Sequence, residues 1–263
     1  MNSLMPLLRL SLREALRGRW LLVIAATLAT TGELLLRFGG GGATTIVSLI
    51  DVVLILAPML GLVAGTVQVH HARDLTELLL AQPVSRQRLF LGLYLGNALP
   101  LAGAIVVGMV APFLWHGLLF GPMGLRLVPL LAVAIGLTCL STALAFLVAL
   151  RIDDRVRALG LALVVWLGAA VLWDGVILVI SLLLGQRSIE AAMLTLLALN
   201  PIDVSRVLLL LGTDASALLG YTGAVVQDVL GTSLGRTGLV ITLMLWLVLP
   251  FGLAARAFQR KSF

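Results

Sequence analysis

Long apolar runs separated by short polar clusters dominate the pattern of this chain. A helix needs roughly 20 mostly apolar residues to cross the hydrocarbon core of a bilayer. Six stretches approach or exceed that length, namely residues 20–36, 43–69, 89–114, 127–150, 159–184 and 239–255. The pattern predicts an all-α polytopic membrane protein with six transmembrane helices, forming a single domain over residues 1–263.

The segment before the first span has a different periodicity. Leucines and arginines recur there every four residues, so each set follows one side of a helix. The leucines are Leu8, Leu12 and Leu16, and the arginines are Arg9, Arg13 and Arg17. The spacing predicts an N-terminal amphipathic helix over residues 1–19 that lies in the membrane interface. The alternative is a solvated start to the first span.

The connection between spans five and six, residues 185–238, is long and rich in leucine. Asn200 is placed as the N-cap of a helix with Pro201 at its first position and Asp203 in its first turn. This helix is expected to run through Leu211 and to stop at Gly212. It rises only about 16 Å, too little to span. With a second short helix at 215–230, the region is predicted to form an outer helical hairpin.

Charge then orients the chain. Hydrophobic residues make up 60% of the sequence and charged residues 11%. The predicted spans put 13 of the 18 basic residues on one face and five on the other, namely Arg37, Arg126, Arg187, Arg206 and Arg236. Cytoplasmic loops carry the excess of Lys and Arg, so both termini are expected in the cytoplasm, with the protein in a bacterial inner membrane. Charges that flank apolar spans meet lipid, which excludes nucleic acid as a partner.

Three acidic residues lie within or near the ends of apolar spans, where a charge is costly and therefore informative. They are Glu33, Asp51 and Asp174. Glu33 and Asp51 are close enough to a span end to reach interfacial water. Asp174 starts deeper, so it either lines a translocation path or is a partnered carboxyl that holds helices together.

Catalytic and metal-binding patterns are absent from the sequence. Cys139 is the single cysteine, and the adjacent His70 and His71 would point in different directions on a helix, with His116 across the membrane. The only lysine is Lys261, which no Gly-rich phosphate loop precedes. We therefore expect no catalytic residue, no metal site and no cofactor in this chain.

The loop between spans two and three, residues 70–88, combines charge with an apolar patch. Arg73 and Glu77 stand four apart, which places them on one helix face with Asp74 nearby. Leu78 begins a three-leucine patch before Pro83 breaks the helix. The pattern predicts a short amphipathic helix suited to docking in a partner's groove. A solvated connector is the alternative.

This loop resembles the inner loop of permease subunits of ABC-2-type transporters. The matching residues are Thr76, Leu78, Leu79, Leu80, Pro83, Ser85 and Arg86. Within that class the chain is most similar to the NosY permeases of the NosDFY system, which matures nitrous oxide reductase. That likeness rests on residues 160–163, Trp166, Asp174, the 199–203 segment and Arg206.

The resemblance implies a homodimer with two cytoplasmic NosF-like ATPase subunits, which bind ATP and Mg, and a periplasmic NosD-like protein. Its coupling residues would be Asp74, Glu77, Leu78, Pro83 and Arg86, with Arg13 and Arg17 from the interfacial helix. Its outer partner-binding residues would be Asn200, Pro201, Asp203 and Arg206. The resemblance implies that the complex delivers copper or a sulfur species, or exerts force on the periplasmic partner. Alternatives are an ABC-2 exporter of a lipid, drug or peptide, and a membrane enzyme or scaffold.

Overall fold

The computed structural model describes residues 19–39, 42–80, 85–184, 189–212 and 230–261. Within these ranges all regular structure is helical, and six helices are long and apolar enough to cross a membrane. Five are α2 (Arg19–Phe38), α3 (Gly42–His71), α5 (Arg86–Trp115), α6 (Pro122–Arg151) and α12 (Ser233–Arg260), and the sixth joins α7 (Arg155–Leu167), η1 (Gly168–Leu172) and α8 (Trp173–Leu184). The prediction of six spans is confirmed.

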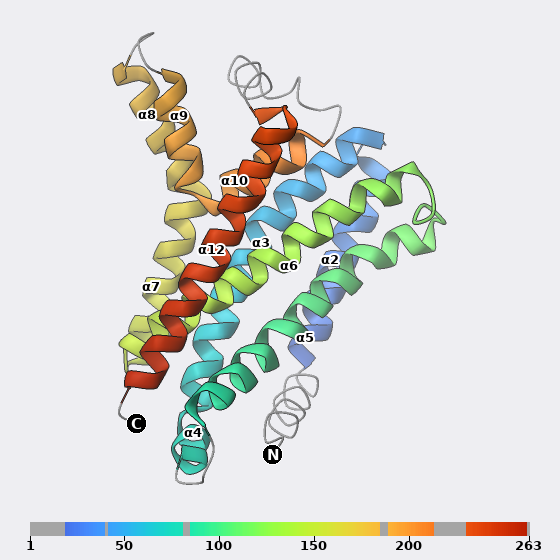
Figure 1. Cartoon of the computed structure of the whole chain (residues 1–263). Coiled ribbons are helices and arrows are strands. Elements are labelled where there is room, and N and C mark those ends of the chain that lie inside the picture. The colour runs from blue at the N-terminus through green and yellow to red at the C-terminus, as the bar shows by residue number, and fades with distance from the viewer. Residues whose placement is uncertain (1–18, 40–41, 81–84, 185–188, 213–229, 262–263) are drawn as a thin grey trace.

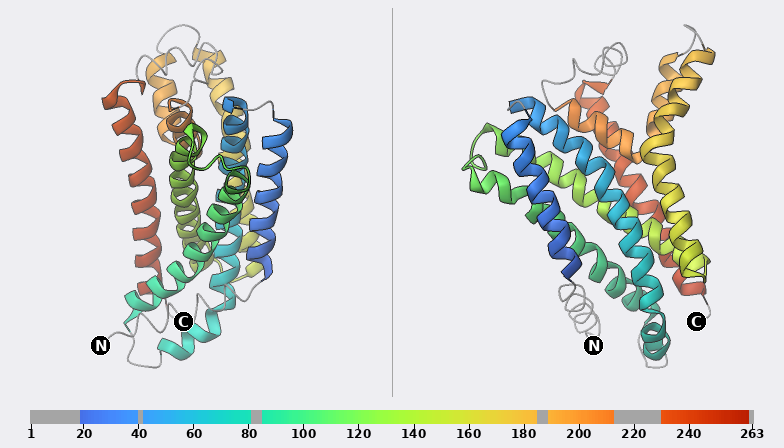
Figure 2. Two further views of the ribbon diagram at one scale, coloured as in Figure 1. Left: turned by 90° about the vertical axis from the view of Figure 1, so that its right-hand side faces the viewer. Right: turned by 180° about the vertical axis from the view of Figure 1, so that it is seen from behind.

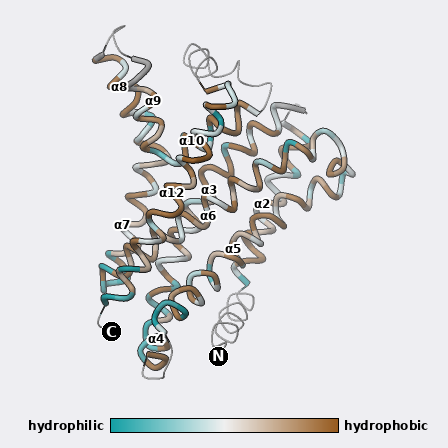
Figure 3. The backbone as a smooth tube through the Cα atoms, viewed as in Figure 1, coloured by the Kyte–Doolittle hydropathy of each residue, from teal (hydrophilic) through white to brown (hydrophobic). Residues whose placement is uncertain are grey.

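Three short helices do not span: α4 (Arg73–Leu80) lies at one end of the bundle, α9 (Ile189–Ala198) lies beside α8 toward the other end, and α10 (Pro201–Leu210) lies between α9 and α12 (Figure 1). We call the end that carries α4 and the last turn of α12 the α4 end, and the opposite end the α9 end. Hydrophilic residues gather at the α4 end, whereas the bundle between the ends is mostly hydrophobic (Figure 3).

Helices α3 and α6 form the centre of the bundle because two glycines let them approach closely. A Cβ on Gly61 would overlap the Ser141 hydroxyl, and one on Gly65 would lie 2.7 Å from the Cβ of Ala145. Gly61-x-x-x-Gly65 is therefore a helix-packing motif. Gly117-x-x-x-Gly121 has the same spacing but does not pack helices, because Gly117 has a φ of 66° in the turn after α5.

Aromatic rings in edge-on and tilted contacts join α5, α6 and α12 at the α4 end. Phe90 lies 5.9 Å from Phe146, 5.5 Å from Phe251 and 5.7 Å from Phe258 between ring centroids. Tyr94 belongs to the same cluster and donates a hydrogen bond of 2.9 Å to the Cys139 carbonyl. Ala72, the residue just before α4, is buried in the same cluster, so the cluster anchors the start of α4.

At the α9 end the bundle opens. Helices α8 and α9 lie side by side and splay away from α2 and α5, as Figure 1 and the right view of Figure 2 show. Helix α10 returns from α9 into the bundle and packs against α3, α6 and α12. Several predicted features lie outside the described residues: the interfacial helix up to residue 18 with Arg13 and Arg17, Pro83, and most of the predicted 215–230 helix.

Candidate functional site

Helix α4 presents one face to the bundle and the other to solvent. On the inner face Thr76 is 2% exposed and donates a 2.6 Å hydrogen bond to the Ala72 carbonyl. On the outer face Asp74, Glu77 and Leu78 are exposed, and Leu78 retains 69% of its accessible surface. Their spacing of three and four residues puts these side chains on one helix face. An exposed leucine beside two carboxylates suits docking into a partner.

An ion-pair network ties α4 to two other segments at this end. Arg73 lies 3.6 Å from Glu77 on its own helix and 3.3 Å from Asp153 in the turn between α6 and α7. Lys261, which follows α12, lies 2.9 Å from Asp153 and also donates to the Leu150 carbonyl at 2.8 Å. The hydrogen bond from Lys261 holds the pKa of Asp153 below its ordinary value. Three segments of the chain therefore meet around the Asp153 carboxylate.

Two further residues strengthen this junction. Arg86 donates hydrogen bonds of 3.2 Å and 2.6 Å to the carbonyls of Gln259 and Lys261, which satisfies the end of α12. His70 lies with its ring nitrogens 2.9 Å from the Thr66 carbonyl and 3.2 Å from the Ile152 carbonyl. A neutral imidazole has one N–H, so His70 donates to both carbonyls only as an imidazolium.

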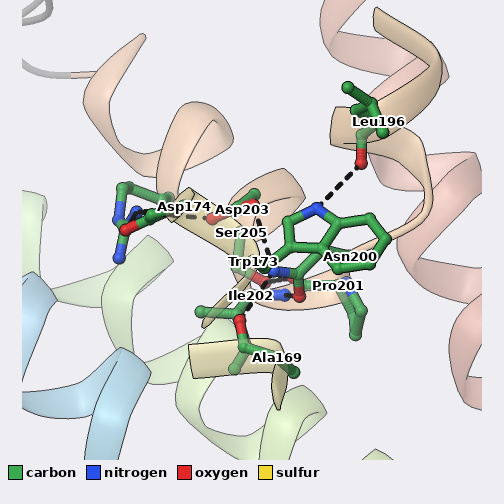
Figure 4. A network of polar contacts seen from close by, with 10 residues as sticks. Ala169, Trp173, Asp174, Leu196, Asn200, Pro201, Ile202, Asp203 and Ser205 are labelled. Carbon is green, nitrogen blue, oxygen red and sulfur yellow. Dashed lines mark hydrogen bonds and ion pairs between the residues drawn. The ribbon is translucent and has the colours of Figure 1, made fainter. Parts of the chain in front are cut away.

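Beside η1, halfway along span five, Asn200 is the centre of a buried polar network (Figure 4). It is 2% exposed, and its side-chain oxygen accepts a 3.1 Å hydrogen bond from the Ile202 amide, which confirms the predicted N-cap. Its amide nitrogen donates to the Ala169 carbonyl at 2.8 Å and to the Asp203 carboxylate at 3.0 Å. Ala169 lies in η1, a π-helical segment, a distortion that frequently marks functional sites. One side chain thus starts α10 and binds it to span five.

Asp203 extends this network to a second ion pair. It is 5% exposed, and burial raises its pKa to about 6, partly opposed by Arg206. Arg206 lies 3.3 Å from Asp203 and 3.4 Å from Asp174 on α8. The Asp203–Arg206 pair follows from their spacing, whereas the pair with Asp174 joins two helices. Asp174 therefore has an ion-pair partner on α10 while its side chain remains 56% exposed, and its role stays a prediction.

Two tryptophans fix α9, which the sequence analysis did not predict. Trp173 donates a 3.2 Å hydrogen bond to the Leu196 carbonyl, and Trp246 of α12 donates a 2.9 Å bond to the Ala198 carbonyl. The signal for α9 was a run of strong helix formers just before Asn200. That run was interpreted as part of an irregular connection.

The predicted outer residues are mostly hidden within the chain. Asn200, Pro201 and Asp203 are buried, so they hold α10 in place and would shape a docking surface without touching a partner themselves. Glu33 lies at the α9 end, 2.6 Å from Arg37 and 3.0 Å from His116 of the turn after α5. Asp51 is exposed on α3.

Comparison with known proteins decides among the families. A family model described as "ABC-2 family transporter protein" matches residues 5–263. The chain belongs to the ABC-2 transporter family. It is also 29% identical to the "Probable ABC transporter permease protein NosY" of Pseudomonas aeruginosa, over 96% of both chains. The protein with the same description from Stutzerimonas stutzeri is 28% identical over 99% of both chains.

The chain is an ABC-2 permease subunit, a membrane component that is not itself catalytic, and such a permease implies an ATPase partner.

Proposed function

We propose that this chain is the permease of a NosY-like ATP-driven complex. In this proposal the α4 end faces the cytoplasm of a bacterium with an inner membrane, and a homodimer binds two NosF-like ATPases there. The α9 end faces a periplasmic NosD-like protein. ATP and Mg are bound by the ATPases, and the complex supports maturation of nitrous oxide reductase by delivering copper or a sulfur species or by exerting force.

The observation that carries the proposal is the exposed face of α4. Leu78 is exposed beside Asp74 and Glu77, so a partner's groove would receive one apolar anchor next to two charges. Buried apolar anchors contribute most of the binding energy at such interfaces, and flanking charges set orientation and specificity. The 13 to 5 distribution of basic residues supports a cytoplasmic position for this end.

The junction around Asp153 supplies a route for force. A displacement of α4 by the ATPase is resisted by Arg73, which pulls on Asp153 and, through it, on Lys261. The turn between α6 and α7 would then move with the end of α12. Because α7 continues through η1 into α8, the motion would reach Asp174 and the network at Asn200.

The first experiment reverses charge on α4 in the double variant Asp74→Arg/Glu77→Arg. Both side chains are exposed, so the permease should still fold, but it should lose ATPase association and permease-stimulated ATP hydrolysis. The matched control is Arg157→Glu, an exposed charge on α7 at the same end, which should leave both unchanged. Unchanged assembly and unchanged stimulation in the double variant would remove α4 from the docking site.

The second experiment tests the NosY-like role. The chain should be purified from its native membrane with every co-purifying protein identified, and the gene should be deleted in a strain that respires nitrous oxide. The proposal expects an ATPase and a periplasmic protein in the complex, and nitrous oxide reductase that lacks activity in the deletion. Full reductase activity in the deletion would instead favour an ABC-2 exporter of another substrate.

A further inference from the structure

The imidazole of His70 connects the end of α3 to the turn between α6 and α7. Its Nδ1 lies 2.9 Å from the Thr66 carbonyl, one helical turn back on α3, and its Nε2 lies 3.2 Å from the Ile152 carbonyl, 82 residues further along the chain. Ile152 directly follows α6, and Asp153 is the next residue of the same turn. We call these two contacts of His70 the His70 clasp.

Both contacts of the clasp are hydrogen bonds only when the ring carries two protons. A carbonyl oxygen is an acceptor, and a neutral imidazole has one N–H and one lone pair. In either neutral tautomer, one ring nitrogen would therefore direct its lone pair at a carbonyl oxygen at 2.9 Å or 3.2 Å. Two negative partial charges at that distance repel each other. Loss of the ring proton therefore opens one side of the clasp.

The side that opens is the contact with Ile152. Thr66 is fully buried within α3, so the position of its carbonyl relative to His70 is fixed by the helix. Ile152 is partly exposed in a turn between two helices, where its carbonyl can rotate toward water. Exchanging one hydrogen bond for another with water changes the free energy little. The turn can therefore leave His70 without unfolding the helices that it joins.

The charge of His70 acts on the ion-pair junction at Asp153. Lys261 contributes most to the low pKa of Asp153, and the charges of Arg73 and His70 add to it. The other charged or titratable groups close to the clasp are His71 on α3, Arg151 on α6, Asp154 in the turn and Arg155 on α7. Among these types of side chain, histidine is the one that ordinarily changes charge between about pH 5 and 8. His71 is therefore the necessary control for His70.

We propose that the His70 clasp is a pH-sensitive switch at the α4 end. When the imidazole is protonated, it ties α3 through Ile152 to the turn that carries Asp153. When the imidazole loses its proton, the turn separates from α3, and Asp153 is left with Arg73 and Lys261 alone. Acid therefore stiffens the connection between α3 and the α6–α7 turn, and alkali loosens it. The switch is a property of the permease chain and does not depend on the proposed function.

The first measurement is hydrogen exchange of the purified full chain in detergent between about pH 5.5 and 8, with each rate divided by the intrinsic rate at the same pH. The reporter is the segment 152–158, in which the amides of Ile152, Arg157 and Ala158 are hydrogen-bonded. In the wild type its protection should fall about tenfold from the acid to the alkaline end, the effect of losing one hydrogen bond to a charged group. His70→Gln does not titrate, so its protection should not change with pH.

Two variants serve as controls. His71→Gln removes the neighbouring histidine, which is exposed and has no hydrogen bond within the described part of the chain, so the tenfold change should remain. Asp203, whose pKa burial raises to about 6, titrates in the same range but lies beside η1. Asp203→Asn should therefore also keep the change in segment 152–158.

Nitrogen NMR of the histidine-labelled wild type reads the charge of the ring directly, so it does not require the His70 variant to fold. The chain has three histidines, and the spectra of His71→Gln and His116→Gln identify the His70 signals by elimination. His70 should carry two ring N–H groups at the acid end and lose one over the pH range in which protection falls. A ring that keeps one charge state throughout would overturn the proposal. Protection that is independent of pH in the wild type, or that changes equally in His70→Gln, would overturn it as well.

Discussion

Replacing Asn200 tests the network that joins α10 to span five. Asn200→Ala removes an N-cap, which costs about 1 kcal/mol. It also leaves the buried Asp203 carboxylate and the Ala169 carbonyl without their shared donor, and an unsatisfied buried group costs about 1–3 kcal/mol. We expect a loss of about 2–4 kcal/mol in the apparent free energy of unfolding, seen as a melting temperature lower by several degrees.

The measurement is thermal unfolding of the purified protein in detergent, followed by circular dichroism. Asn200→Ser is the matched control, because its hydroxyl still accepts from the helix start but cannot reach both other partners. Asn200→Ser should be less stable than the wild type and more stable than Asn200→Ala, the latter by about 1 kcal/mol because the N-cap is retained. A change below about 0.5 kcal/mol in Asn200→Ala, or a serine variant less stable than the alanine variant, would refute the assignment of Asn200 as a triple hydrogen-bonding residue.

Three other expectations follow from single contacts. Gly61→Ala should destabilise the protein by about 1–3 kcal/mol in thermal unfolding because its Cβ overlaps Ser141, whereas Gly103→Ala, with open space around it, should be neutral or slightly stabilising. Burial raises the pKa of Asp203, which lies beside Arg206, Asp174 and Asn200, from 3.8 to about 6. The folded state therefore gains stability that is fully present below about pH 4 and is lost as pH rises through about 6. Asp203→Asn should flatten that part of the curve of stability against pH. Asp153→Asn should release Arg73 and Lys261 together, so hydrogen exchange should rise in 73–80 and at the end of α12, and unchanged exchange in either segment would contradict the junction.

Local features of the fold were predictable because their causes are local. Apolar length sets the six spans, and the Asn200-Pro201 pair starts α10 by the usual capping rule. The Asp203–Arg206 and Arg73–Glu77 pairs follow from helical spacing alone. In each case the interacting atoms are within a few residues of each other in the chain.

Features that depend on tertiary packing were not predictable in the same way. The sequence analysis assigned no role to Asp153, yet Asp153 forms ion pairs with Arg73 and Lys261, which come from distant segments of the chain. The partner of Asp174 became visible only once α10 was placed beside α8. The burial of Asn200 and Asp203 likewise depends on α10 turning back into the bundle, whereas the sequence suggested an outer surface.

The most direct test of the account is a site-specific cross-link at α4. In a Cys139→Ser background, Leu78→Cys places the only thiol of the chain on the exposed face of α4. Phe120→Cys, 95% exposed at the α9 end, is the control. With a short thiol-to-amine cross-linker in native membranes, the Leu78→Cys protein should form a covalent adduct with the ATPase, and the Phe120→Cys protein should not. An ATPase adduct from Phe120→Cys and none from Leu78→Cys would contradict the claim that α4 is the docking helix.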